Sequence, residues 1–175
     1  MKLKVTKKQN SAQDCLVCGV RNPFGLRAQY YELEDGTLAG VVEARGEHQS
    51  YPGRVHGGVI TALLDETIGR AVNIEEPDTW AVTVQIDVRF KKPVPYGKPL
   101  LVLGRITENN RRLFSGTGEI VLPDGTVAAS ATARYMKQKI TAISEAFGEE
   151  AWRAYPAEND PAYIEVPDAA RKGGE

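Results

Sequence analysis

Sulfur-containing residues and tryptophan are scarce, with two cysteines, two methionines and two tryptophans among 175 residues. Two cysteines cannot build the disulfide framework of a small secreted protein. The longest uninterrupted apolar runs have four or five residues, far fewer than the roughly 20 that cross a bilayer. The basic first eight residues are followed by no apolar stretch, which a signal peptide requires. We therefore expect a cytoplasmic protein that does not enter a membrane.

Charge of one sign is not in excess either. The 22 basic and 23 acidic residues leave a net charge of −1, so no overall field attracts nucleic acid. Hydrophobic residues at 42% and charged residues at 26% are ordinary globular values, which excludes a wholly disordered or collagen-like chain. The length fits one domain that can bury its core without a disulfide or a metal.

Six segments alternate apolar and polar residues between turn-forming residues, which predicts six strands. They are residues 26–34, 37–44, 81–90, 100–107, 112–122 and 126–136. In the segment 81–90 the alternation is regular. It predicts one face made of Val82, Val84, Ile86, Val88 and Phe90, and an opposite face made of Thr83, Gln85, Asp87 and Arg89.

Between the second and third strands, residues 57–73 contain no proline and have apolar residues at helical spacing around most of the circumference. Such a helix must be buried on several sides. Hairpin-linked strands are antiparallel. We therefore predict an α+β fold in which one antiparallel sheet wraps around a long central helix.

We divide the chain into three segments. Residues 1–25 are expected to be an irregular lead-in that carries Cys15-x-x-Cys18, and residues 26–137 the main domain. Residues 138–175 are expected to be an appendage with a short helix around 142–155 and a partly disordered tail. Its residues 141–175 hold eight acids and three bases.

Gly57 and Gly58 stand where the helix is predicted to begin. The first N–H groups of a helix have no partner within it, and they carry the positive end of the helix dipole. They suit a phosphate, a carboxylate or a developing oxyanion. The two glycines could equally serve only close packing or a tight turn, and residue chemistry alone leaves the two interpretations even.

Asp65 lies two turns into this apolar helix. No cation stands three or four residues away, where its neighbours are Thr61, Ala62, Ile68 and Gly69. A carboxylate among apolar groups has a raised pKa unless it is bonded, and such sites are often functional. The alternatives are a solvated face or a partner across the fold. Glu66, by contrast, has Arg70 four residues on, an ordinary exposed pair.

Several other constellations are missing or incomplete. The sequence has no Gly-x-Ser-x-Gly and no glycine-rich phosphate loop ending in Lys-Ser or Lys-Thr. Cys15 and Cys18 are half of a zinc site that nothing else in one chain completes, although two subunits could pool four thiolates. We expect reduced, structural cysteines. His48 and His56 have no evident third ligand, so we expect no metal and no cofactor.

His56-Gly57-Gly58 followed by Leu64-Asp65 resembles the motif of hotdog-fold acyl-CoA thioesterases of the PaaI-like branch. The resemblance spans about residues 14–137, and the predicted strand order agrees with the hotdog fold. The segment around Cys15 and Cys18, with Asn22-Pro23 and Gly25-Leu26 after it, resembles the opening of a subset of these proteins.

The resemblance implies a role for each matching residue. Asp65 would be the general base or the nucleophile that attacks a thioester carbonyl. The backbone N–H of Gly57, helped by Gly58, would hold the oxyanion. His56 would orient the thioester or the loop, and Thr83 matches a hydroxyl that helps to place the water.

The resemblance also implies substrate contacts. Relatives carry Asn or Gln ahead of the glycines, where this chain offers Gln49 and Ser50 without distinguishing between them. Arg89, Lys91 and Lys92 could meet the phosphates of coenzyme A, as could Arg111 and Arg112; for any single one, a solvated strand end is the commoner role. Asp87 is a weaker candidate acid because Arg89 lies on the same face.

In the resembling family the active site lies between two subunits, with the acid of one facing the glycine amides of the other. A lone sheet would also leave a strand edge unpaired. We therefore expect a homodimer or a homotetramer.

The sequence thus predicts a hydrolase of acyl-CoA or a similar acyl thioester, with no nucleic-acid partner. One alternative is an acyl-CoA hydratase of the same fold, whose Asp stands five residues before a His; here Glu43 and Tyr51 occupy those places. The other is a non-catalytic acyl-CoA binder or sensor, which the sequence hardly separates from an enzyme. The acyl group stays open.

Overall fold

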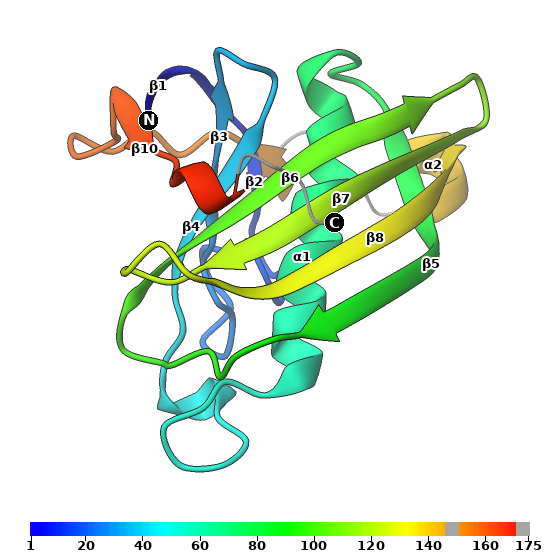
Figure 1. Ribbon diagram of the computed structural model, residues 1–175. Coiled ribbons are helices and arrows are strands. Elements are labelled where there is room, and N and C mark those ends of the chain that lie inside the picture. Colours follow the sequence, from blue (N-terminus) through cyan, green and yellow to red (C-terminus); the bar gives the residue numbers. More distant parts are fainter. Residues whose placement is uncertain (146–150, 171–175) are drawn as a thin grey trace.

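One curved sheet wraps around a single long helix, α1, in the computed structural model (Figure 1). The structure describes residues 1–145 and 151–170. All paired strands of the sheet are antiparallel, in the order β10-β1-β3-β4-β6-β7-β8-β5. The strands are β1 (Lys2–Lys8), β3 (Gln29–Leu33), β4 (Leu38–Glu43), β5 (Trp80–Phe90), β6 (Pro99–Asn109), β7 (Leu113–Val121), β8 (Val127–Gln138) and β10 (Tyr163–Glu165). The predicted α+β fold class is confirmed.

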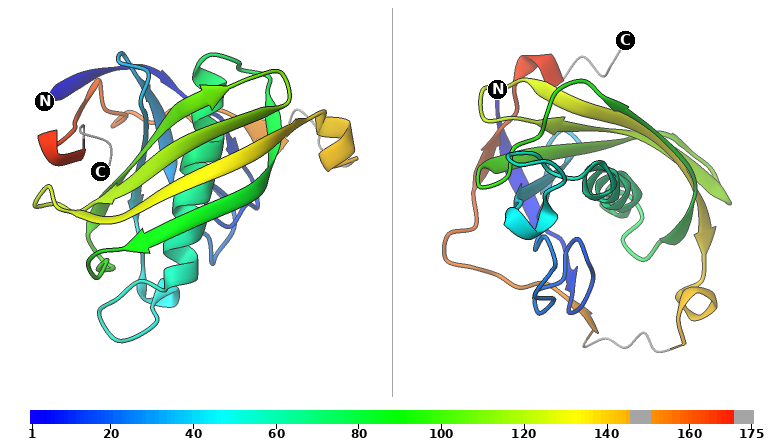
Figure 2. Two further views of the ribbon diagram at one scale, coloured as in Figure 1. Left: turned by 45° about the vertical axis from the view of Figure 1, so that its right-hand side comes forward. Right: turned by 90° about the horizontal axis from the view of Figure 1, so that it is seen from below.

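Helix α1 (Gly57–Ala71) lies against the concave face of the sheet, as the end-on view in Figure 2 shows. His56 before it has extended backbone and ends the preceding loop. Leu63, Leu64 and Ile68 on the helix are completely buried. The helix gives way to a short 3-10 turn, η2 (Val72–Ile74). The apolar periodicity of residues 57–73 therefore predicted the helix correctly.

The helix sits unusually close to the middle of the sheet because the strands beneath it carry glycine. A Cβ atom on Gly104 of β6 would lie 2.7 Å from the backbone oxygen of Thr67. A Cβ atom on Gly118 of β7 would lie 2.8 Å from Cγ1 of Ile68, and one on Gly116 would lie 2.7 Å from Cγ2 of the same side chain. These distances are too short for any real Cβ, so glycine is what lets α1 lie this deep.

Strand β5 contains a bulge that the sequence did not reveal. Its pairing with β8 shifts between Thr83 and Gln85. A bulge adds one residue to the strand and reverses the alternation of faces beyond it. Thr83 on one side of the bulge and Phe90 on the other therefore both face α1. The expectation that Thr83 lies on the face opposite to Phe90 is wrong for this reason.

The N-terminal segment is more regular than expected. Residues 2–8 fall within the predicted irregular lead-in, but they form β1, which pairs with β3 and β10. Leu3 is buried and Val5 partly buried between basic residues, so the charges conceal an alternating strand pattern. The lead-in also contains β2 (Ser11–Ala12), which pairs with β9 (Trp152–Arg153).

The C-terminal segment differs from the prediction as well. The expected helix at 142–155 is limited to α2 (Ile140–Ile143) among the described residues, and residues 146–150 lie outside them. Beyond β9, strand β10 joins the main sheet, followed by the 3-10 turn η4 (Asp168–Ala170). Ile164, Val166 and Ala170 are buried in a second apolar cluster with residues of β1, β3, β4, β6 and β7. The burial of these few apolar side chains orders a segment whose acidic composition predicts partial disorder. Residues 171–175 of the predicted tail lie outside the described part.

Within the described residues, no helix combines the length and apolar character needed to cross a membrane. The three-segment division of the chain stays a prediction.

Gly118→Ala should destabilise the protein by about 1–3 kcal/mol, because the new methyl group overlaps Ile68 in a packed core. Gly46→Ala is the matched control, since a Cβ there meets nothing within 4 Å, and it should change stability by less than about 0.5 kcal/mol. Urea unfolding followed by circular dichroism measures both. Equal stability of the two variants would contradict the close helix–sheet contact.

Candidate active site

Asp65 projects from α1 toward the two strands at the end of the sheet. Its Oδ1 accepts hydrogen bonds from Thr83 Oγ1 of β5 at 2.9 Å and from Tyr135 OH of β8 at 3.1 Å. The same tyrosine hydroxyl lies 2.9 Å from the Asp65 backbone oxygen. Thr83 and Tyr135 are directly paired across β5 and β8. One cross-strand pair therefore holds one oxygen of the carboxylate.

Burial raises the pKa of Asp65 above its ordinary value of 3.8, because desolvation disfavours the charged form. The hydrogen bonds from Thr83 and Tyr135 oppose this effect by stabilising the carboxylate, whereas the nearby charge of Glu66 adds to it. No cation is among the groups that shift the pKa of Asp65. The two hydroxyls thus orient the group without neutralising it, which leaves the carboxylate basic.

Asp65 lines a small pocket of about 180 Å³. The other walls come from the helix, from β5 and β8, and from the C-terminal segment. They are Glu66, Gly69, Arg70, Asn73, Trp80, Ala81, Thr83, Tyr135 and Trp152. The pocket therefore combines an oriented acid with two indole side chains, an arrangement suited to a ligand that is partly apolar.

The other candidate group lies at the N-terminus of α1. His56 is the N-cap residue, and its Nδ1 accepts a hydrogen bond from the Gly58 N–H at 2.9 Å. No hydrogen bond from the Gly57 N–H to an acceptor in the described part of the chain is found. A Cβ on Gly57 would lie 3.6 Å from the ring of Phe90. Of the two glycines predicted to hold an oxyanion, Gly57 is the one whose N–H is not used by His56.

A single chain does not bring Asp65 and Gly57 together. They are eight residues apart on one helix, which corresponds to about 12 Å along its axis. A hydrogen bond requires a separation near 3 Å. The acid and the helix N-terminus are therefore two separate candidate half-sites in one chain, and both lie beside β5, next to Thr83 and Phe90 respectively.

The remaining predicted substrate contacts gather at the Gly57 end of the molecule. Gln49 and Ser50 lie in an exposed loop, closed by a bridge between Gln49 and Val55, that leads directly into His56. Arg89, Lys91 and Lys92 are exposed at the end of β5 on either side of Phe90. Because these residues lie beside Gly57 and Phe90, they are distant from Asp65 of the same chain.

The additional basic pair lies at the opposite end. Arg112 belongs to the turn between β6 and β7, where its backbone oxygen accepts a hydrogen bond from the Lys137 N–H. Lys137 pairs with Ala81 in β5, two residues from Thr83. Arg111 and Arg112 are thus on the Asp65 side of the sheet.

Sequence reasoning missed Tyr135, although a signal for it exists. Ala129, Ala131, Ala133 and Tyr135 alternate along β8 on the face toward α1. The same alternation that places the alanines against the helix therefore also places the tyrosine there. Trp152 could not be found in this way, because its segment has no repeating pattern that leads to the pocket.

The interpretation of Glu66 and Arg70 as an exposed pair is wrong. Their Nε–Oε1 distance is 2.8 Å, but Arg70 is only 5% exposed. Its guanidinium lies 4.6 Å from the ring centroid of Tyr30 and 4.4 Å from that of Trp152. The lead-in and the C-terminal segment cover this face of α1, so the i, i+4 pair that the sequence shows is enclosed.

Comparisons with known proteins bear on the family and the fold. Residues 52–129 match the family model "Thioesterase superfamily". The chain is 26% identical over 111 residues to the acyl-coenzyme A thioesterase THEM4 of Mus musculus, covering 63% of this chain and 47% of THEM4. The chain thus spans about half the length of this curated relative.

Solved structures show the same fold. The thioesterase superfamily protein RHA08564 is 30% identical, with a TM-score of 0.64 over 71% of this chain and 60% of that one. The protein smu.793 of Streptococcus mutans, solved with acetyl-CoA bound, is 26% identical, with a TM-score of 0.54 over 59% and 82%. The PaaI protein of E. coli is 17% identical, with a TM-score of 0.59 over 65% and 80%, and this likeness concerns the fold alone.

These matches agree with the curved antiparallel sheet and the central helix. Residues 52–129 are therefore similar to the thioesterase superfamily, and the chain has the hotdog fold.

Proposed function

We propose that this protein hydrolyses acyl-CoA thioesters, with Asp65 as the general base. The observation that carries the proposal is the carboxylate of Asp65, held by Thr83 and Tyr135 in a pocket whose cation, Arg70, donates to Glu66 and Cys18 instead. The similarity of residues 52–129 to the thioesterase superfamily and the likeness to an acyl-CoA thioesterase support the reaction class. An acetyl-CoA ligand in a similar structure supports the coenzyme.

In the proposed reaction Asp65 removes a proton from a water molecule as the water oxygen attacks the thioester carbonyl. Thr83 and Tyr135 both donate to Oδ1, which leaves Oδ2 to accept the proton. The tetrahedral intermediate then breaks its C–S bond, releasing a carboxylic acid and the coenzyme A thiolate, which takes up the proton that Asp65 received. The raised pKa of Asp65 suits this role, because a more basic carboxylate drives proton transfer better.

The Gly57 N–H stabilises the negative oxygen of that intermediate in our proposal. One such donor contributes about 3 kcal/mol of transition-state stabilisation, and the helix dipole acts in the same direction. His56 already occupies the Gly58 N–H. We therefore assign the oxyanion contact to Gly57 and the orientation of the helix start to His56.

The two half-sites would meet if two copies paired along β5. This strand ends the sheet and has one neighbouring strand, β8, within the described chain. Its apolar side chains Val84 and Phe90 are 55% and 56% exposed, which is unfavourable on an unpaired edge. An antiparallel pairing about a two-fold axis perpendicular to the sheet would set the Thr83 end of one β5 beside the Phe90 end of the other, with both helices on the same face. Asp65 and Gly57 from different subunits would then face one site.

The same pairing would bring Arg89, Lys91 and Lys92 of one copy to the Asp65 side of the other. These basic residues suit the phosphates of coenzyme A, and Gln49 and Ser50 in the neighbouring loop would line the same end. We propose them as the coenzyme-binding part of the site, with a homodimer as the smallest complete unit.

Asp65→Asn should lower kcat/KM for acyl-CoA hydrolysis by about 10²- to 10⁴-fold, because the amide cannot accept the proton from water. Release of free thiol, followed with a thiol reagent over a panel of acyl-CoAs, measures it. Asp35→Asn, in the exposed turn between β3 and β4, is the matched control and should keep full activity. Thiol release that continues unchanged in Asp65→Asn would refute the base, and retention of acyl-CoA without thiol release by the unmodified protein would show a binder instead.

The pH dependence should report the environment of Asp65. Activity should rise with pH as Asp65 loses its proton, with the midpoint above the ordinary 3.8 because burial raises its pKa. Thr83→Val removes a hydrogen bond that lowers the pKa of Asp65, so the acid limb of the kcat/KM profile should move to higher pH. A shift to lower pH in Thr83→Val would contradict the assignment.

Mixing two inactive variants should restore activity if the site is shared between subunits. Gly57→Pro removes only the N–H at the first helical position, where proline is tolerated. The extended backbone of His56, with φ −63° and ψ 138°, already suits a following proline. A dimer of Gly57→Pro and Asp65→Asn chains has one site with both groups intact. Random exchange should therefore recover about a quarter of the unmodified activity.

The control for this mixing is each variant exchanged with itself, which should stay inactive. Recovery requires that Asp65 and Gly57 of one site come from different chains. Active Gly57→Pro homodimers would remove Gly57 from the mechanism, and folded mixed dimers without activity would disprove the shared site.

A further inference from the structure

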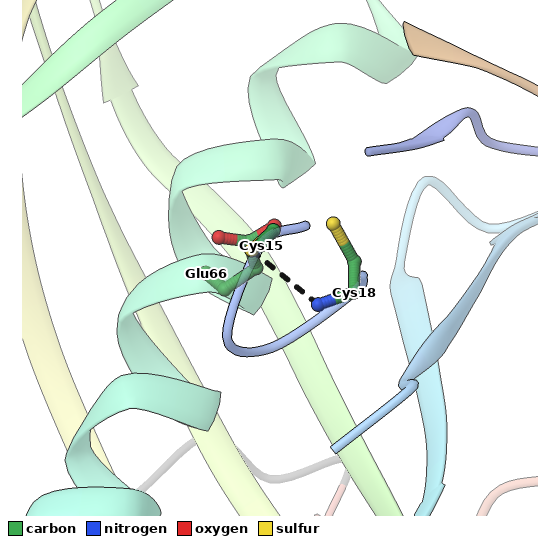
Figure 3. Close-up of side chains that lie close together, drawn as sticks. All are labelled: Cys15, Cys18 and Glu66. Atoms are coloured by element: carbon green, nitrogen blue, oxygen red, sulfur yellow. Dashed lines mark hydrogen bonds between the residues drawn. The ribbon is translucent and has the colours of Figure 1, made fainter. Parts of the chain in front are cut away.

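Beside the pocket, the lead-in places two cysteines against the helix that carries Asp65. Cys15 and Cys18 belong to the turn that follows β2, and Glu66 projects toward them from α1 (Figure 3). One donor atom from each of the three side chains lies within 4.8 Å of the other two. Among the described residues, this is the group of cysteine, histidine and acidic side chains that comes close enough to hold a metal ion.

The turn is built so that both sulfur atoms stay on one side. The backbone N–H groups of Val17 and Cys18 donate to Cys15 Sγ at 3.3 and 3.5 Å, and the Gly19 N–H closes the turn on the Cys15 oxygen at 3.0 Å. A Cβ on Gly19 would lie 2.2 Å from that oxygen, so this position requires glycine. Backbone donors aimed at a sulfur atom stabilise its thiolate form.

Three potentially negative groups meet at this point, with one cation beside them. Arg70 donates to Cys18 Sγ at 2.9 Å and to Glu66 Oε1 at 2.8 Å. Cys15 Sγ lies 4.0 Å from the same Glu66 oxygen. With both thiols ionised, Arg70 would balance only one of three negative charges.

We propose that Cys15, Cys18 and Glu66 bind one thiophilic divalent cation, of which Zn²⁺ is the best match. Zinc takes cysteine sulfur at about 2.3 Å and carboxylate oxygen at about 2.0–2.2 Å. In a tetrahedral sphere those bond lengths separate two sulfurs by about 3.8 Å, and a sulfur from an oxygen by about 3.6 Å. Cys15 Sγ and the Glu66 oxygen are 4.0 Å apart, and all three ligand atoms lie within 4.8 Å of one another. The side chains would therefore have to move by only about 1 Å to reach the separations of a zinc site.

The charges favour a divalent ion at this site. Two thiolates and a carboxylate carry −3, which a divalent cation and the Arg70 guanidinium together neutralise. Arg70 then acts as an outer neighbour that donates to Cys18 and Glu66, the kind of contact that orients metal ligands. Binding would release the protons that the cysteines still hold.

A dithiol that served only to form a disulfide would not need Glu66. Its carboxylate is an ordinary zinc ligand. The sequence alone showed half of this site, and the fold supplies the third ligand from the residue next to Asp65. Bound metal would fasten the lead-in turn to α1 and leave a fourth position open.

The test is metal binding by the full chain, stripped with a chelator and kept reduced with a phosphine. Zinc titration in a calorimeter should show one ion per chain. Cobalt should produce the sulfur-to-cobalt charge-transfer absorption that reports thiolate ligands. Cys15→Ser and Glu66→Gln should each weaken zinc binding at least tenfold, whereas Glu75→Gln, which alters an exposed acid just past the same helix, should leave it unchanged.

Asp65→Asn should bind zinc like the unmodified chain, which separates this site from the proposed hydrolysis. Circular dichroism checks that each variant is folded. If a variant is unfolded, the sulfur-to-cobalt absorption of the unmodified chain decides whether the cysteines bind the metal. Absence of the charge-transfer band, full affinity in a folded Glu66→Gln, or one ion per two chains would each overturn the site. The site would also be overturned if the protein, purified in reducing buffer, contained a Cys15–Cys18 disulfide and took up no metal.

Discussion

The close contact between helix α1 and the glycines of β6 and β7 determines where the functional groups of this protein lie. Because Gly104, Gly116 and Gly118 have no side chains, the helix sinks until Thr67 and Ile68 touch the strands. The residue two positions before Thr67 is then within hydrogen-bond distance of β5 and β8. Asp65 meets Thr83 and Tyr135 there. Side chains of ordinary size on those strands would push the acid away from both hydroxyls.

Strand β5 has the second decisive role, since it borders both half-sites. Its bulge lets Thr83 and Phe90 both face the helix, although their positions differ by seven and an odd difference normally places two residues on opposite faces. In a regular strand the two would lie on opposite faces, and only one of them could take part in the site. The bulge also leaves apolar side chains along an edge that has no partner within the described chain. The strand that holds Asp65 through Thr83 thus also provides the edge along which, in our proposal, a second copy would pair.

The two ends of the chain form the other side of the helix. β1 and β10 extend the sheet, and the short β2–β9 pair brings the cysteine turn and Trp152 to α1. Arg70 is held between these segments, with Tyr30 and Trp152 on its faces and Glu66 and Cys18 on its edge. A buried guanidinium with so many partners is costly to expose. Consecutive residues of one helix, Asp65 and Glu66, therefore face two chemically different sites.

Local patterns were sufficient for much of this protein. The apolar periodicity of residues 57–73, the alternation in the main strands and the turn residues between them determined the elements and the α+β fold, because these signals depend only on neighbours along the chain. The same patterns singled out Asp65 and the paired glycines, since a lone acid in an apolar helix is conspicuous. Only the tertiary structure decided what they contact. The bulge at Thr83–Gln85, the burial of Arg70 and the approach of Cys15 and Cys18 to Glu66 depend on segments distant in sequence, and no local pattern records which distant segments will pack together.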